Sequence, residues 1–214
     1  MKLLIFTQKI DTKDSVLGFF HNWVIEFSKK FEKVTVICLQ KGEYSLPDNV
    51  KVLSLGKEEG LGRMVYIKRF YSYIYRERKN YDSVFVHMNQ VYIILGGLLW
   101  KLWGKKMGLW YAHGSISRSL RVAEKMTDLV FTSTQSGFRL PSKKINIMGQ
   151  GIDPHLFKPL GDNVYSKENF FNIISVGRIS PIKDYDTFID AISLVHNNDK
   201  NVSIIPRDSG SNDR

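Results

Sequence analysis

The chain has 214 residues, of which 31 are lysine or arginine and 21 are aspartate or glutamate, so its formal net charge is +10. Hydrophobic residues make up 43% and charged residues 24% of the sequence, a composition typical of a globular protein and not of a disordered one. The single cysteine, Cys38, excludes a disulfide scaffold and a cysteine-based zinc cluster. Because it lies in an apolar run, we expect a buried strand residue there and not a nucleophile.

Two apolar stretches could target the chain to a membrane, but neither is suitable. The run at 3–6 holds four apolar residues, which is too short for the core of a signal peptide. The uncharged stretch 83–100 is interrupted by His87, Asn89 and Gln90, so it fits a strand and a helix better than a membrane span. We therefore expect a cytoplasmic chain that associates at most peripherally with the inner membrane surface.

The positive charge is concentrated in the first part of the chain. Residues 1–152 hold 24 basic and 12 acidic residues, whereas residues 153–214 hold 7 basic and 9 acidic ones. Such an excess is typical of proteins with anionic partners, which include nucleic acids, membrane surfaces and phosphorylated substrates. Ordinary solubility explains the charge equally well, so the charge alone does not identify a partner.

Strand-like runs alternate with helical patterns along most of the chain. Strands are expected at 2–7, 33–39, 50–55, 83–87, 107–111, 129–132 and 145–148. Helices are expected at 19–31, 61–79, 91–103 and 118–126. A second alternation follows, with a strand at 169–176, a helix at 184–196 and a strand at 201–205.

This alternation predicts an α/β fold made of parallel βαβ units. Residues 1–152 are expected to form a Rossmann-like, doubly wound and mostly parallel sheet. Residues 153–168, which contain two prolines and a glycine, are expected to be a linker. Residues 169–214 then form the first β-α-β fragment of a second Rossmann-like domain. In such folds ligands bind beyond the carboxyl ends of the strands, so the segments after each strand are the candidate sites.

The clearest of these segments follows the strand that ends at Val176. In the run VGRISPIKD (176–184), Arg178 and Lys183 lie five residues apart in a loop before a helix. Two cations beside the free N–H groups of a helix start suit a diphosphate. On spacing alone, a pair of solvated basic residues explains this run equally well.

A second candidate is WYAHG (110–114), where His113 directly follows a predicted strand and Gly114 permits close approach of the backbone. An imidazole at this edge could bind a sugar hydroxyl or a phosphate, and a capping or packing histidine is as compatible with the pattern. The remaining histidines show no metal-ligand spacing, so no metal is expected.

Four motifs together resemble a known family in their order and spacing, over residues 1–205. They are the early glycine loop around Gly18, WYAHG (110–114), GQGIDPHLFKP (149–159) and VGRISPIKD (176–184). The chain is similar to the retaining glycosyltransferases of family four, which have the GT-B fold of two facing Rossmann-like domains. The resemblance implies transfer of a sugar from a nucleoside-diphosphate donor to a glycan or lipid-linked acceptor, with retained configuration and neither metal nor other cofactor.

The resemblance also assigns roles to residues. Arg178 and Lys183 would hold the donor diphosphate. His113 would be the catalytic residue that contacts the donor sugar, and Gly18 would lie in the acceptor loop. Family members continue through a complete second domain with a Glu-x7-Glu element, whereas here a polar tail follows Pro206 and Asp184 replaces the usual glycine. We therefore expect a chain truncated in its nucleotide-sugar-binding domain and inactive as it stands.

Two other functions remain alternatives. A lone acceptor-side domain could act as a non-catalytic module that docks on a membrane or a partner. Nucleic-acid binding, suggested by the isoelectric point of about 9.6, is the weakest alternative because the aromatic residues follow core patterns and do not interleave with basic ones.

A peripheral membrane contact is expected from the segment 61–106, which holds nine basic and two acidic residues. At about 100° per residue, Tyr66, Ile67, Phe70 and Ile74 share one face of the long helix and should pack on the sheet. The opposite, outward face is expected to carry four cations, which are Lys68, Arg69, Arg76 and Lys79. A solvated helix face is the alternative, at even odds on the pattern alone.

Overall fold

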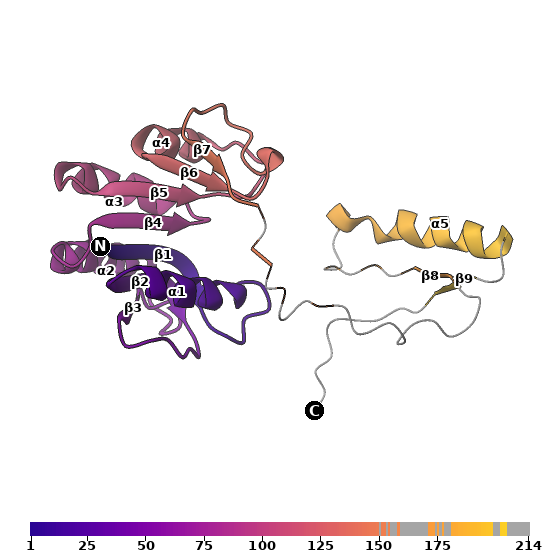
Figure 1. Cartoon of the computed structure of the whole chain (residues 1–214), viewed down its shortest axis with the longest axis horizontal. Helices are drawn as coiled ribbons and strands as arrows, with labels where there is room; N and C mark the ends of the chain where they lie inside the picture. The colour runs from indigo at the N-terminus through magenta and orange to yellow at the C-terminus, as the bar shows by residue number, and fades with distance from the viewer. Residues whose placement is uncertain are drawn as a thin grey trace. The chain divides into compact units, whose positions relative to one another are not determined.

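The protein forms two compact units, Met1–Gly151 and Ile152–Arg214, which are described separately. The computed structural model describes residues 1–149, 151–152, 154, 158, 171–173, 175, 177, 181–198 and 202–204 (Figure 1). The expected linker 153–168 and the loop residue Arg178 therefore lie outside the described residues, apart from positions 154 and 158.

The first unit contains a seven-stranded sheet whose strands lie in the order β3-β2-β1-β4-β5-β6-β7 (Figure 1). Every neighbouring pair in this sheet is parallel, which confirms the doubly wound α/β fold expected from the alternating pattern. The strands are β1 (Lys2–Ile10), β2 (Lys33–Lys41), β3 (Val50–Ser54), β4 (Ser83–His87), β5 (Lys106–Trp110), β6 (Leu129–Thr132) and β7 (Ile145–Ile147).

Helices cover both faces of this sheet, but not to the same extent. The larger hydrophobic cluster includes side chains from α2 (Arg63–Glu77), α3 (Val91–Leu102) and α4 (Arg118–Met126). The cluster on the other face includes α1 (Phe19–Lys30), which packs over β1 and β2. Cys38 belongs to this second cluster and is fully buried, as the sequence predicted, and burial raises the pKa of its thiol to about 12.

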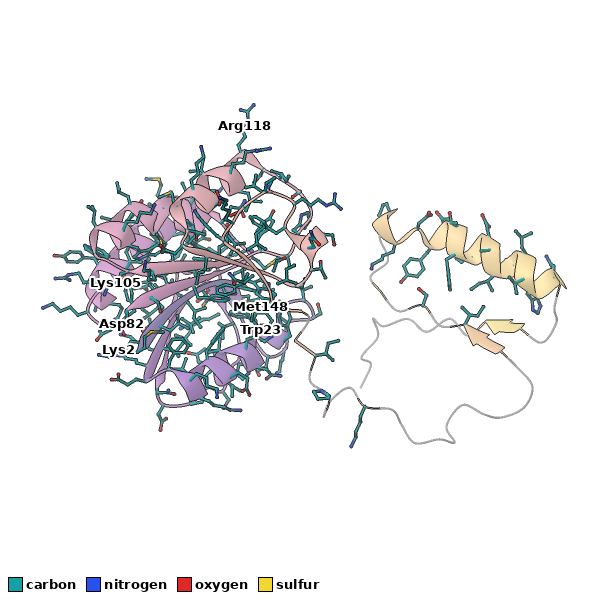
Figure 2. All side chains as sticks on the ribbon, turned by 45° about the horizontal axis from the view of Figure 1, so that its top comes forward. Lys2, Trp23, Asp82, Lys105, Arg118 and Met148 are labelled. Atoms are coloured by element: carbon teal, nitrogen blue, oxygen red, sulfur yellow. The ribbon has the colours of Figure 1, made fainter. Side chains whose placement is uncertain are left out.

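The half of the sheet beside α1 carries an apolar groove of about 900 Å³. Gly108 of β5 forms part of its floor, and a Cβ at this position would lie 3.0 Å from the ring of Phe131. Trp23 and Met148 both line the groove (Figure 2). Its walls include six half-buried aromatic side chains, which are Trp23, Phe27, Phe31, Phe85, Trp110 and Phe131.

The second unit is a small β-α-β arrangement. The strands β8 (Phe171–Ile173) and β9 (Val202–Ile204) are parallel, as expected for a unit in which a helix connects them. The short 3₁₀ helix η2 (Pro181–Lys183) precedes α5 (Tyr185–Asn198), and Ile192 of α5 is buried.

Candidate functional site

The candidate site lies at the carboxyl edge of the seven-stranded sheet. From β1 the chain proceeds through β2 to β3 on one side, and it then crosses to β4 on the other side of β1. The crevice where the strand order diverges, between β1 and β4, is the usual ligand position in such sheets. The loops after β1, β4, β5 and β6 surround this point.

The loop after β1 is held by a compact network of charges. The ammonium group of Lys9 lies 3.0 Å from a carboxylate oxygen of Asp11 and 2.9 Å from one of Asp14. The second oxygen of Asp14 accepts the backbone N–H groups of Val16 and Leu17. The hydrogen bond from Lys9 and these N–H groups lower the pKa of Asp14 to about 2.

Gly18 ends this loop and precedes α1. A Cβ at Gly18 would lie 2.6 Å from the carbonyl oxygen of Asp14, to which the N–H of Gly18 donates at 3.0 Å. The glycine is therefore required for the loop to close on itself. Its role as part of an acceptor loop remains a prediction.

His87 lies at the end of β4 and is 1% exposed. Its ring stacks on Phe20 with centroids 4.0 Å apart, and its Nδ1 lies 3.3 Å from the hydroxyl of Thr7 on β1. Within the described part of the chain, its Nε2 has no hydrogen-bond partner. Burial lowers the pKa of His87 to about 3, so the ring is neutral at physiological pH.

His113 follows β5 and is exposed, in contrast to His87. Its Nδ1 accepts the backbone N–H of Ser115 at 3.2 Å and lies 2.9 Å from the hydroxyl of the same residue. Because a backbone N–H can only donate, Nδ1 carries no proton in this arrangement, and the neutral ring holds its proton on Nε2. His113 can therefore donate a hydrogen bond to an oxygen atom of a ligand.

Two buried aromatic rings interlock the loops after β5 and β6. Tyr111 and Phe138 meet edge to face with ring centroids 6.0 Å apart, and the hydroxyl of Tyr111 donates to the carbonyl of Ser115. The exposed Arg139 follows Phe138 and lies against Gly114, beside His113. Sequence reasoning missed this arginine, because no local spacing connects positions 114 and 139.

In the second unit, Lys183 is exposed at the end of η2. The hydroxyl of Tyr185 donates to the carbonyl of Gly177 at 3.0 Å, and a Cβ on Gly177 would lie 3.6 Å from Cε of Lys183. Asp184 has φ of 48°, a left-handed conformation that glycine adopts freely and aspartate tolerates. This conformation explains why a glycine suits the position that Asp184 occupies.

The prediction of four outward cations on α2 is only partly correct. Lys68, Arg76 and Lys79 are exposed, but α2 ends at Glu77, so Lys79 lies beyond the helix and not on its outer face. Arg69, the fourth expected cation, is half-buried, and both of its terminal nitrogens donate to the carboxylate of Glu59 at 2.9 Å. Its charge is therefore neutralised within the protein.

The predicted inner face of α2 also needs correction. Phe70 and Ile74 are buried as expected, but Ile67 is 40% exposed. Glu77 is buried instead, paired with Lys51 at 2.7 Å. The inner face is therefore rotated towards Glu77, and Ile67 falls at its margin.

The described residues also bear on membrane insertion and on metal binding. No helix in the described residues is long and apolar enough to span a membrane. The same residues contain no group of three or more His, Cys, Asp or Glu side chains that could hold a metal ion.

Comparison with known proteins identifies the fold. No protein-family model and no curated protein sequence matches the chain. Among solved structures, Anabaena HepE in complex with UDP aligns with a TM-score of 0.62 at 16% identity, over 91% of this chain and 58% of that chain. HepE with UDP-glucose aligns with a TM-score of 0.61 at 16% identity, over 95% of this chain and 59% of that chain.

Two further solved structures share the same fold. The UDP-GlcNAc 2-epimerase from Methanocaldococcus jannaschii has a TM-score of 0.55 at 11% identity, and covers 97% of this chain and 66% of its own. MurG from Acinetobacter baumannii has a TM-score of 0.52 at 10% identity, with coverages of 98% and 69%. The chain spans less than two thirds of the length of the HepE structures. At these identities the likeness shows a Rossmann-like α/β fold that is also found in UDP-sugar proteins.

Proposed function

We propose that this chain belongs to a glycosyltransferase that uses a nucleoside-diphosphate sugar, of the retaining family-four type. The observation that carries the proposal is His113, which lies at the carboxyl edge of β5 with its Nε2 proton free to meet a ligand oxygen. The fold occurs in proteins crystallised with UDP and UDP-glucose. Because the same fold serves epimerases, the four motifs of the sequence are what favour transfer over epimerisation.

In this proposal the two units have different tasks. Arg178 and Lys183 of the second unit hold the donor diphosphate, whose negative charge grows as the sugar leaves. His113 of the first unit donates a hydrogen bond to the donor sugar, and the loop that ends at Gly18 faces the acceptor. The acceptor is a glycan or a lipid-linked molecule. The chemistry needs neither a metal nor a further cofactor.

Calorimetric titration with UDP and UDP-glucose tests the donor assignment. We expect saturable binding of both, and we expect Arg178→Ala and Lys183→Ala each to weaken it at least tenfold, because each removes a charge-assisted contact. Lys125→Ala, at an exposed lysine in the last turn of α4, is the matched control and should leave binding unchanged. If UDP does not bind, or binds equally to all variants, the proposed function is wrong.

A second proposal concerns an anionic membrane surface as a partner. The helices α2 and α3 pack side by side, since the hydroxyl of Tyr71 donates to the carbonyl of Leu95 and the rings of Tyr75 and Trp103 lie 6.4 Å apart. Large apolar side chains are exposed on them, namely Tyr75 (57%), Leu98 (65%) and Leu102 (73%). Exposed cations are interspersed along the same segment, which are Lys68, Arg76, Lys79 and Lys101. Aromatic, aliphatic and basic residues in such a mixture suit a lipid interface.

Liposome co-sedimentation tests this partner. Each cation near an anionic surface contributes about 1 kcal/mol, so replacing Lys68, Arg76, Lys79 and Lys101 with glutamine should abolish binding to acidic vesicles. Binding of the parent should require acidic lipid and decrease with salt. Lys125→Gln, at an exposed lysine of α4 and outside this segment, is the control. Equal binding by the quadruple variant would show that these cations are only a solvated surface.

A further inference from the structure

Arg139 occupies a defined position on the candidate site. A Cβ placed on Gly114 would lie 3.2 Å from both Cζ and Nε of Arg139 and 3.4 Å from Nη2. These nearly equal distances mean that the flat face of the guanidinium lies over Gly114. The N–H groups of a guanidinium lie in its plane, so they point outward around the glycine and not into it.

The backbone on both sides of this contact is fixed. Phe138 and Leu140, which flank Arg139, are 3% and 8% exposed. Phe138 packs against Tyr111, and a Cβ on Gly137 would lie 3.5 Å from Cα of Ala112. The loops after β5 and β6 are therefore closely packed, and they place Arg139 over Gly114, the residue that follows His113 in the chain.

The charge of Arg139 is uncompensated within the described chain. Arg139 is exposed, and over that part of the protein no hydrogen bond or ion pair engages its guanidinium. The loops after β5 and β6, residues 111–117 and 133–144, contain no aspartate or glutamate. In contrast, Lys9 near the end of β1 is paired with two carboxylates of the following loop. Arg139 is therefore an unpaired cation at the part of the sheet edge formed by the loops after β5 and β6.

The helix that follows β5 adds to the positive potential. The first turn of α4 holds no acidic residue and begins with Arg118 (Figure 2), with Arg121 three positions later. The dipole of a helix favours acidic residues at its start, so these arginines are placed against the electrostatic preference of the helix. A dianionic ligand at this edge would relieve the repulsion.

We propose that Arg139 is a phosphate-binding residue: its guanidinium, lying over Gly114, binds a phosphoryl group together with the Nε2–H of His113. A guanidinium offers a planar fork of donors that matches two phosphate oxygens. This inference rests on the proposed function, in which the phosphoryl group belongs either to the nucleotide-sugar donor or to a phosphorylated lipid acceptor. The donor assignment to Arg178 and Lys183 does not include Arg139.

Amide NMR spectra of the complete chain provide the test. The probes are UDP, inorganic pyrophosphate and geranyl phosphate, with uridine and geraniol as their phosphate-free counterparts. We expect the phosphate probes to shift the amide resonance of Ser115 saturably, and the phosphate-free probes to leave it unchanged. Response to UDP and not to geranyl phosphate identifies the donor as the source of the phosphoryl group, and the reverse response identifies the acceptor.

Three variants separate a phosphate contact from a general charge effect. Arg139→Gln should weaken the response of Ser115 at least tenfold, because one charge-assisted contact is lost. Gly114→Ala keeps the arginine but displaces its guanidinium, so it should weaken the response as well. Arg63→Gln removes the same charge from the exposed first residue of α2 and should change nothing. An unchanged spectrum elsewhere confirms that each variant is folded.

The outcomes distinguish this inference from the proposed function. If UDP binds to the protein but the response of Ser115 is the same in Arg139→Gln as in the parent, the role of Arg139 is refuted and the nucleotide-sugar function stands. If pyrophosphate or geranyl phosphate shifts Ser115 through Arg139 but UDP binds nowhere, the phosphate site stands without the proposed donor. If no phosphate probe shifts Ser115, the inference is wrong.

Discussion

Two histidines at the carboxyl edge of the sheet differ in burial, and their possible roles differ accordingly. His87 is stacked on Phe20, beneath the surface, with a pKa lowered to about 3. A ring that stays neutral and enclosed is unsuited to proton transfer with a ligand. His113 is exposed and has its proton on the outer nitrogen. The sequence places both at strand ends, and only the packing of α1 against β4 separates the buried ring from the accessible one.

The burial of His87 predicts how stability depends on pH. As the pH falls below the ordinary value of 6.5, the unfolded chain takes up a proton that the folded protein does not accept until the pH nears 3. The contribution of neutral His87 to the free energy of unfolding is therefore retained above pH 6.5 and is lost as the pH falls below it. At pH 5.0 the free energy of unfolding should be about 2 kcal/mol lower than at neutral pH because of this residue.

Urea titrations at pH 7.5 and pH 5.0 measure this contribution. The variant His87→Leu should lose about 2 kcal/mol less than the parent between the two pH values. Comparing each protein with itself at the two pH values removes the packing effect of the substitution. Subtracting the two losses from one another then removes the titration of all other groups. An equal loss in both proteins would mean that His87 is protonated in the folded state.

At the scale of elements, the loop between β1 and α1 depends on Asp14. This carboxylate accepts two backbone N–H groups just before α1 and pairs with Lys9. Loss of hydrogen bonds between a carboxylate and backbone N–H groups costs about 1 kcal/mol, so Asp14→Ala should lower stability by this amount and raise amide hydrogen exchange at residues 15–18. Because the pKa of Asp14 is about 2, the carboxylate stays charged and these hydrogen bonds should persist down to pH 3.

Hydrogen exchange of residues 15–18, measured by mass spectrometry, tests the role of Asp14 at pH 7 and, after correction for intrinsic exchange rates, at pH 3. The control is Asp48→Ala, at an exposed aspartate in the turn before β3, which should leave residues 15–18 unchanged. Equal exchange in Asp14→Ala and the parent would show that Lys9 and Gly18 hold the loop without the carboxylate.

The arrangement of helices and strands was largely predictable from the sequence. The alternation of apolar runs was sufficient for the order of elements, because each parallel strand and its helix follow a local periodicity. The inner face of α2 was misplaced because only apolar residues were counted as buried. Glu77 is buried through its pairing with Lys51, a contact between residues distant in sequence that periodicity does not contain.

The candidate site shows the same limit. His113 was predictable because a residue after a parallel strand lies at the ligand edge. Arg139 was not predictable, since its contact with Gly114 depends on the packing of Tyr111 against Phe138. The contact between two loops depends on the tertiary structure, whereas the end of a strand can be predicted from the local sequence pattern.

At the scale of the whole molecule, the first unit contains complete hydrophobic clusters of its own. Among the residues that the structure describes, all members of both clusters lie between Leu3 and Ile145, so ending the chain after Ile152 removes none of these. A domain of about 150 residues buries enough surface to fold independently. We therefore expect residues 1–152 to unfold cooperatively, with the same urea midpoint and slope as the 214-residue chain.

Tryptophan fluorescence is a suitable measurement because the four tryptophans, at positions 23, 100, 103 and 110, all belong to the first unit. The fluorescence transition should therefore be the same for the short and the complete chain, while far-UV circular dichroism of the complete chain also reports α5. A clearly lower midpoint for residues 1–152 would mean that the second unit stabilises the first. Since His113 and Arg139 both lie in the first unit, the short chain should also keep the response of Ser115 to inorganic pyrophosphate, which ties the phosphate site to this unit alone.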